Sequence, residues 1–76
     1  MRQFLTEVVR GLVSEPGRVS VHESRDRDVV VLELSVAPGD RGRVIGRQGA
    51  TADALRTLLS AIGHEQGVAV ELEILD

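Results

Sequence analysis

Hydrophobic residues recur with the period of a helix in two long segments of the chain and with the period of a strand in three. The first helical segment spans residues 2–14, and its apolar positions form one stripe: Leu5, Val8, Val9, Leu12 and Val13. The Pro16-Gly17 pair predicts the end of this helix. The polar side of the segment is not rich in basic residues, so the pattern favours a helix that packs on a core over one that lies on a membrane.

Three segments have the pattern of strands. Residues 18–24 alternate weakly, and a polar turn at residues 24–28 separates them from residues 28–37, the strongest strand signal. That second strand has one wholly apolar face: Val30, Leu32, Leu34 and Val36. The last segment, residues 68–76, alternates cleanly and places four apolar residues on one face: Val68, Val70, Leu72 and Ile74. Strands of this kind predict a sheet that helices cover on one face.

Two further helices are predicted between the second and third strands. Asp40 is a candidate N-cap for a short helix over residues 41–45, and a longer helix is predicted over residues 50–62, with Gly63 as its C-cap. The apolar positions of the longer helix repeat at helical spacing: Leu55, Leu58, Leu59 and Ile62. The predicted order is α-β-β-α-α-β, an α+β fold in which three helices lie on one face of a three-stranded sheet. With 76 residues, the chain forms a single domain over residues 1–76.

Composition excludes several classes of protein. The chain has no cysteine, and its two histidines, His22 and His64, lie in no ligand spacing typical of a metal site, so neither a metal nor a cofactor is expected. No carboxylate pair or nucleophile–base set points to an enzyme. Since no apolar run approaches ~18 residues and no signal peptide is recognisable, the expected location is the cytoplasm.

Positive charge is concentrated in one segment of an otherwise acidic chain. The formal net charge is −3. Between residues 41 and 56 there are four arginines and one acid, which gives this segment a charge of +3. The segment contains the densest glycine cluster of the chain, so a candidate anion-binding site is expected there.

The glycine cluster centres on Gly46-Arg47-Gln48-Gly49, a tight turn between two predicted helices. A P-loop is excluded because the chain has no lysine, and a dinucleotide fingerprint is excluded because position 44 is valine and a helix, not a strand, precedes the turn. A GxxG sequence alone is a weak signal, and a plain helix–helix corner explains it equally well. Its position between two helices, with arginines on both sides, favours the loop with which a KH domain clamps the backbone of about four nucleotides.

Two segments carry a closer resemblance, residues 38–49 (PGDRGRVIGRQG) and residues 54–58 (ALRTL). They resemble the KhpA family of small bacterial KH-domain RNA-binding proteins. The resemblance implies a type II KH fold with a mixed sheet and binding of single-stranded RNA. It also implies the role of an RNA chaperone or post-transcriptional regulator, a homodimer, and pairing with a larger KH-containing protein, KhpB of the Jag/EloR family. In some bacteria that complex is associated with control of cell-wall synthesis and cell length.

The resemblance also implies roles for individual residues. The clamp for the RNA backbone is Gly46, Arg47, Gln48 and Gly49, with the N–H groups of the helix that opens at Ala50 beside it. Independently of the resemblance, the charges of Arg41 and Arg43 near Arg47 suggest that they neutralise further phosphates, and three engaged phosphates predict a salt slope of about −2. Apolar groove or groove-supporting residues are Val44, Ile45 and Leu55, and Arg25 and Arg27 would close the other side of the groove.

A second hypothesis is a KH-fold protein-interaction module with little or no RNA binding. The acidic net charge favours it, as does Ala50, which stands where many relatives carry a basic or polar residue. The arginines at positions 41, 43 and 47 count against it, because a module that binds only proteins has no need of positive charge at the glycine turn. Phe4 is the one aromatic residue, so base stacking on aromatic side chains is not expected.

Overall fold

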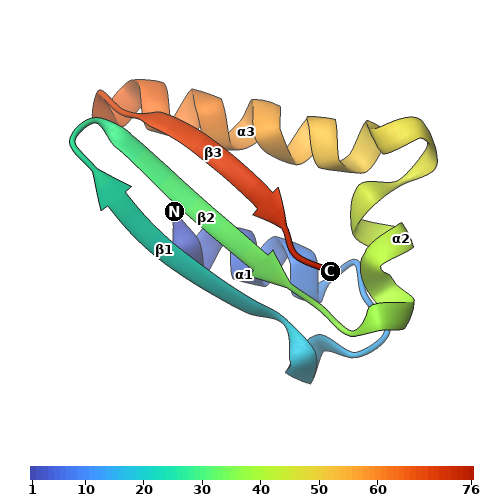
Figure 1. Ribbon diagram of the computed structural model, residues 1–76. Coiled ribbons are helices and arrows are strands. Elements are labelled where there is room, and N and C mark those ends of the chain that lie inside the picture. Colours follow the sequence, from blue (N-terminus) through green and yellow to red (C-terminus); the bar gives the residue numbers. More distant parts are fainter.

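The computed structural model describes residues 1–76 and shows a three-stranded sheet with helices against one face (Figure 1). The helices and strands are α1 (Arg2–Arg10), β1 (Ser20–Asp26), β2 (Val29–Ser35), α2 (Arg41–Ile45), α3 (Ala50–Gln66) and β3 (Ala69–Ile74). Short 3-10 turns, η1 (Pro16–Arg18), η2 (Pro38–Asp40) and η3 (Arg47–Gly49), connect them. The predicted α-β-β-α-α-β order and α+β class are confirmed.

The sheet is mixed, with β2 in the centre. β1 pairs with β2 in antiparallel fashion, and β3 pairs with β2 in parallel fashion. β2 alternates strictly between buried and half-buried residues, and Val30, Leu32 and Leu34 point into the core, as the period of the sequence predicts. The opposite faces of the strands have no helix over them (Figure 1).

The core lies between the sheet and the helices, and every helix contributes to it. Eleven buried residues form one cluster: Leu5, Val9, Val21, Val30, Leu32, Leu34, Val44, Leu55, Leu59, Val68 and Leu72. α1 and α3 lie along the sheet, whereas α2 lies at the end where β2 and β3 finish (Figure 1). Val44 of α2 is fully buried in the same cluster, and this fixes the corner between α2 and α3 against the sheet. None of the helices is both long and apolar enough to span a bilayer.

α1 is shorter than its apolar stripe predicts. It ends at Arg10, where the backbone N–H of Gly11 closes the last turn on the carbonyl oxygens of Val8 and Val9, so the predicted end near residue 14 is wrong. Val13 still packs against the core, but from the loop that follows the helix. The stripe continued past the helix because loop residues can also supply core contacts.

α3 is longer than predicted, and Gly63 is not its C-cap. The helix continues to Gln66, and Gly67 adopts the left-handed conformation (φ 73°, ψ 28°) that ends it. The N–H of Val68 donates to the carbonyl of Gly63 at 2.9 Å, which is the 6→1 hydrogen bond of a Schellman motif. Gly63 instead allows α3 to approach β3, since a Cβ at this position would lie 2.6 Å from Cγ2 of Val70.

β1 also differs from its predicted bounds. It begins at Ser20 and continues to Asp26, because Arg25 and Asp26 pair with Val30 and Val29 of β2. The turn between β1 and β2 is therefore only Arg27-Asp28, and Arg27 has a positive φ of 55°. Two-residue hairpin turns of this kind require left-handed backbone.

Candidate nucleic-acid interface

The backbone of the glycine turn is in a conformation that requires glycine. Gly46 has φ 76° and ψ 175°, a region open in practice only to glycine. A Cβ there would lie 2.8 Å from the backbone nitrogen of Thr51 and closer still to its hydroxyl oxygen. Gln48 and Gly49 follow in left-handed conformation, with φ values of 55° and 79°. The turn is therefore folded tightly against the start of α3.

The start of α3 is the positive end of the helix dipole. No side chain caps this helix, since its N-cap is Gly49 and its first residue is Ala50, which is exposed. The N–H of Ala50 already donates to the carbonyl of Arg47, so the turn offers an anion the positive end of the dipole rather than this N–H. The structure thus places the predicted clamp, residues 46–49, directly before an uncapped seventeen-residue helix.

The four arginines of the positive segment differ in their partners. Arg41 donates from Nε to the carbonyl of Leu75 at 3.0 Å and pairs with the Asp76 carboxylate at 3.0 Å. Arg43 lies 3.5 Å from a carboxylate oxygen of Asp40. Arg56 pairs with Asp53 at 3.6 Å, and the remaining arginine, Arg47, is exposed and takes part in no ion pair or side-chain hydrogen bond. Arg47 is thus the cation of this segment whose charge no carboxylate balances.

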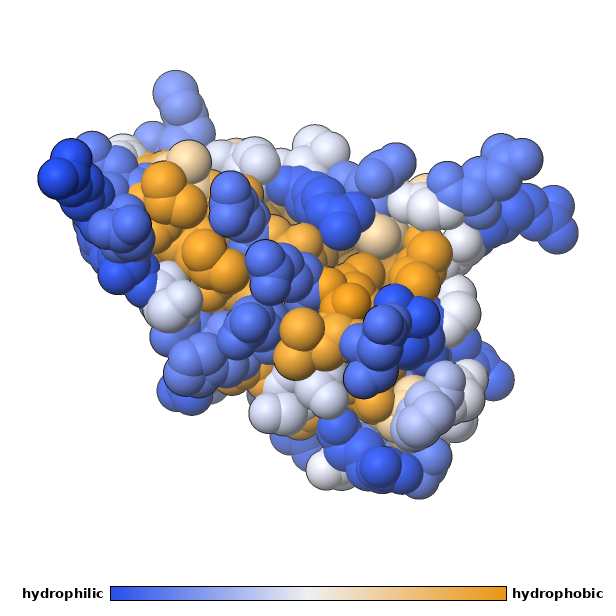
Figure 2. Space-filling view, in the orientation of Figure 1, coloured by the Kyte–Doolittle hydropathy of each residue, from blue (hydrophilic) through white to orange (hydrophobic).

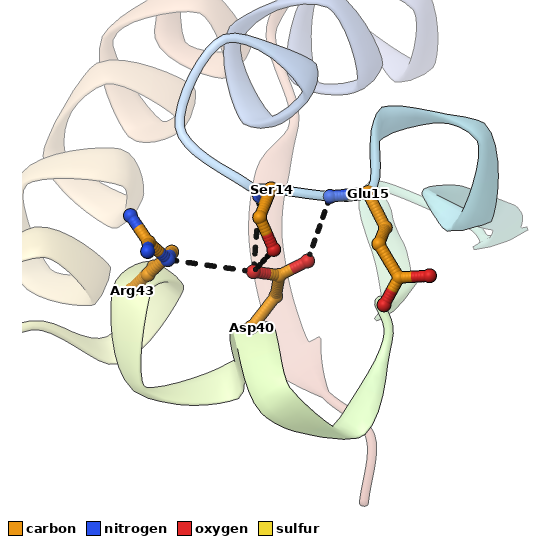
Figure 3. A network of polar contacts seen from close by, with 4 residues as sticks. All are labelled: Ser14, Glu15, Asp40 and Arg43. Atoms are coloured by element: carbon orange, nitrogen blue, oxygen red, sulfur yellow. Dashed lines mark hydrogen bonds and ion pairs between the residues drawn. The ribbon is translucent and has the colours of Figure 1, made fainter.

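Asp40 is buried, and its side chain makes no capping hydrogen bond to α2. Its carboxylate accepts hydrogen bonds from the backbone N–H of Ser14 at 3.0 Å, from the Ser14 hydroxyl at 2.7 Å and from the N–H of Glu15 at 3.1 Å (Figure 3). Asp40 therefore occupies the predicted N-cap position of α2, but its side chain makes no capping hydrogen bond because it binds the loop after α1 instead. These contacts, together with the one to Arg43, form the Asp40 network, which ties that loop to the residue before α2.

The hydrogen bonds of the Asp40 network also set its ionisation. The N–H and hydroxyl of Ser14 hold the pKa of Asp40 below its usual value, and the N–H of Glu15 and the charge of Arg43 act in the same direction. Burial, at 1% exposure, opposes them and is outweighed. The carboxylate is therefore charged at neutral pH and neutralises part of the field of Arg43.

The apolar residues of the predicted groove fall into two groups. Ile45 is half-buried at the end of α2 and has surface left for a ligand. Val44 and Leu55 are buried, with exposures of 0% and 3%, so neither can contact a base directly. Of the two predicted roles, lining the groove or supporting it, the burial of Val44 leaves the second, support of the corner from beneath. Figure 2 shows apolar surface between α2, the start of α3 and the end of β3.

Arg25 and Arg27 lie at the opposite end of the molecule from the glycine turn. Their hairpin meets the start of β3, where the N–H of Ala69 donates to the carbonyl of Asp28 at 2.7 Å. The whole of α3 separates that end from Gly49 (Figure 1), a length of about 25 Å for seventeen residues. The prediction that these arginines close the groove is therefore wrong, because the hairpin turn projects beyond the other end of the sheet.

Comparison with known proteins agrees with the fold. Residues 2–74 match the model of the KH domain of KhpA/KhpB. The chain belongs to this family. The RNA-binding protein KhpA of Treponema pallidum is 43% identical over 74 residues, which cover 97% of this chain and 92% of that protein. The KhpA proteins of Aquifex aeolicus and Chlamydia trachomatis are 42% and 40% identical over 76 residues, which cover 100% of this chain and 96% and 97% of those proteins.

Membership of the family assigns the type II KH fold to this chain. These KhpA relatives are named RNA-binding proteins. One residue with a distinctive position, Arg56, was not among the predicted site residues. Its guanidinium crosses from α3 to the backbone of β3, where Nη2 lies 3.3 Å from the carbonyl oxygen of Leu72. The one signal for it in the sequence is its place in the Leu-Arg-Thr step of α3.

Proposed function

We propose that this chain binds single-stranded RNA through its sugar-phosphate backbone, at residues 46–49 and the start of α3. The observation that carries the proposal is the unbalanced charge of Arg47, placed on a turn whose backbone requires Gly46 and followed by an uncapped helix. A phosphate at this position meets a guanidinium and the positive end of α3 together. The family's named relatives, which are RNA-binding proteins, support the same ligand.

The bases would lie on the apolar surface beside Ile45. The sequence has one aromatic residue, Phe4, and it belongs to α1 rather than to the glycine turn. Stacking on aromatic rings, worth about 1–3 kcal/mol per base, therefore contributes nothing at this site. A single module of this kind binds weakly, and two linked modules gain affinity through effective concentration.

The test reverses the charge of the turn. Arg47→Asp combined with Gln48→Asp should lower affinity for single-stranded RNA at least about tenfold, because two carboxylates would face the phosphates. Both side chains are exposed, so the melting temperature should change little. Fluorescence anisotropy with a labelled oligoribonucleotide measures the affinity.

The matched control makes the same change of charge at the other end of the sheet. Ser24→Asp combined with Arg25→Asp alters the net charge by the same amount at two exposed residues of β1. Affinity for RNA should stay within about threefold of the wild type, because the Debye length at physiological salt is about 8 Å. Equal losses in both variants would show binding through net charge alone, and an unchanged affinity of the Arg47→Asp, Gln48→Asp variant would refute the proposed site.

The proposal extends to assembly. We infer a homodimer, and pairing with a larger KH-containing protein such as KhpB, through the side of α3 that bears Leu58. Leu58 is 49% exposed, the largest exposure among the large apolar side chains of this chain. Leu58→Asp should yield a monomer in sedimentation velocity, whereas Leu12→Asp, at a loop residue of 39% exposure, should leave the assembly unchanged. A monomeric wild type would refute the dimer.

A role as an RNA chaperone in the cytoplasm, linked to cell-wall synthesis and cell length, completes the proposal. The alternative is a KH-fold interaction module without RNA, which the net charge of −3 favours. RNA titrations at two salt concentrations separate the two. RNA binding that weakens as salt rises supports the first, and no binding at either concentration supports the second.

A further inference from the structure

Arg56 is held across the space between α3 and β3. Its Nη2 donates to the carbonyl oxygen of Leu72 at 3.3 Å, and its Nη1 lies 3.6 Å from a carboxylate oxygen of Asp53, one turn earlier on α3. The side chain is 47% exposed. The guanidinium is therefore directed towards β3 while much of its surface stays open to solvent.

The carbonyl that Arg56 contacts lies on the free edge of the sheet. The N–H groups of Ala69 and Leu75 donate to carbonyls of Asp28 and Leu34, at 2.7 and 2.8 Å, so the odd-numbered residues of this strand direct their backbone groups towards β2. Backbone groups alternate in direction along a strand that pairs on one side only. Leu72 therefore directs its N–H and C=O outward, because β3 is an edge strand.

The distance from the glycine turn suits a bound RNA. Arg56 follows Ala50 by six positions on α3, a rise of about 9 Å. Stacked nucleotides repeat at about 3.4 Å along one strand, so about two or three nucleotides cover this distance. An RNA backbone held at residues 46–49 thus brings a base to Arg56 and to the edge of β3.

The guanidinium has N–H groups left for such a base. Of the five N–H donors of an arginine, one is used on Leu72, and the contact to Asp53 is too long for a hydrogen bond. Two parallel N–H groups match a base edge with two adjacent acceptors, which guanine offers at O6 and N7 and cytosine at N3 and O2. Adenine and uracil alternate donors and acceptors on their edges, so they satisfy only one of the two.

We propose that Arg56 is a specificity-determining residue, which selects guanine or cytosine at the position two or three nucleotides from the glycine turn. The inference rests on the proposed function, since it needs RNA bound at residues 46–49. In this arrangement the base is recognised by the side chain of Arg56 on α3 and by the free backbone groups at the edge of β3.

The experiment compares base preference across matched variants. The ligands are labelled uridine oligomers with one guanine, cytosine or adenine at each position in turn. Each oligomer is long enough to cover the about four nucleotides that a KH loop clamps. The wild type should prefer the guanine or the cytosine series at one position by about tenfold or more. Comparison of the guanine and cytosine series identifies which base is selected.

Two variants of Arg56 distinguish a hydrogen-bonding contact to a base from a purely electrostatic contribution to affinity and from a purely structural role. Arg56→Lys keeps the charge without the planar fork, and it should bind all oligomers with similar affinity but show less than about twofold preference. Arg56→Met should lose the preference in the same way, and its melting temperature shows whether the contact between α3 and β3 survives. Arg47→Gln should weaken binding to every oligomer and keep the preference.

Each contrary result has a separate meaning. A wild type that binds no oligomer overturns the proposed function and this inference with it. A wild type that binds RNA without preference, or an Arg56→Lys variant that keeps the preference, overturns this inference alone. A uniform loss of affinity in Arg56→Met, with no change in preference, identifies Arg56 as a phosphate contact and also overturns it.

Discussion

At the scale of single residues, the glycine turn shows which of its positions are fixed by backbone geometry and which by chemistry. Gly46 is fixed by geometry, because its conformation and the closeness of Thr51 leave no room for a Cβ. Gly49 has a positive φ of 79° but open space around it. Arg47 and Gln48 are exposed, so packing does not constrain their side chains, although the left-handed backbone of Gln48 (φ 55°) disfavours β-branched residues there.

Gly46→Ala should therefore destabilise the fold. We expect a loss of about 2–4 kcal/mol in the free energy of unfolding, from the strained conformation and the contact with Thr51. Gly42→Ala is the control, because a Cβ there meets nothing within 4 Å and α2 gains a better helix former. That variant should be as stable as the wild type or more so by about 0.5–1 kcal/mol. Urea denaturation measures both, and equal stabilities of the two variants would contradict the assigned geometry.

At the scale of elements, α2 is positioned from two sides. Val44 packs into the core, and the Asp40 network joins the residue before α2 to the loop after α1, 26 positions earlier in the chain (Figure 3). α2 has only five residues, too few to be stable alone. The glycine turn therefore owes its position to contacts made by α2 with distant parts of the chain.

Asp40→Asn should loosen this arrangement, since an amide N–H would face the backbone N–H of Ser14 or Glu15. We expect a melting temperature lower by roughly 5–15 °C at neutral pH. Because the folded-state pKa of Asp40 lies below its ordinary value of 3.8, the contribution of Asp40 to stability is complete above that pH and is lost as pH falls through the lower folded value. The difference between wild type and variant should thus persist down to about pH 4 and narrow below it.

The control for this change is Asp53→Asn, at a side chain that is 76% exposed. Its melting temperature should stay within about 2 °C of the wild type, because exposed ion pairs contribute little. Thermal unfolding between pH 2 and pH 7, followed by circular dichroism, measures all three proteins. If the difference in melting temperature between wild type and Asp40→Asn grows steadily as the pH falls below 3.8, the assigned ionisation of Asp40 is contradicted.

The elements that the sequence predicts well are those that depend on local periodicity. The alternation in β2 and β3 identifies their buried faces, and the segment around residues 46–49 identifies the KH fold. The ends of α1 and β1 depend on local turns, whereas two other misinterpretations involve contacts that periodicity does not show. Asp40 looks like a cap until Ser14 is seen beside it, and Gly63 looks like a helix end until Val70 is seen against it. The partners of the arginines are equally hidden, because Asp76 and Leu72 approach only in the folded chain.

At the scale of the whole molecule, the net charge of −3 and the binding of a polyanion are reconciled by the pairing of charges. Three of the arginines between residues 41 and 56 are balanced by carboxylates. Arg47 is left as the main source of positive field at the glycine turn. Binding should therefore depend on one side chain more than the count of arginines suggests.

The salt dependence of RNA binding measures this difference. Each phosphate neutralised on a single strand contributes about −0.7 to the slope of log K against log salt concentration. Arg47→Gln should make the slope less steep by about 0.7, because its contact releases a counterion without breaking an ion pair. Arg41→Gln is the matched change, at a guanidinium that already pairs with Asp76 at 3.0 Å. Its effect on the slope should be less than half as large, since Arg41 exchanges one anionic partner for another. Equal changes in the two slopes would mean that Arg41 contributes as a free cation, and that the ion pair with Asp76 has no influence on RNA binding.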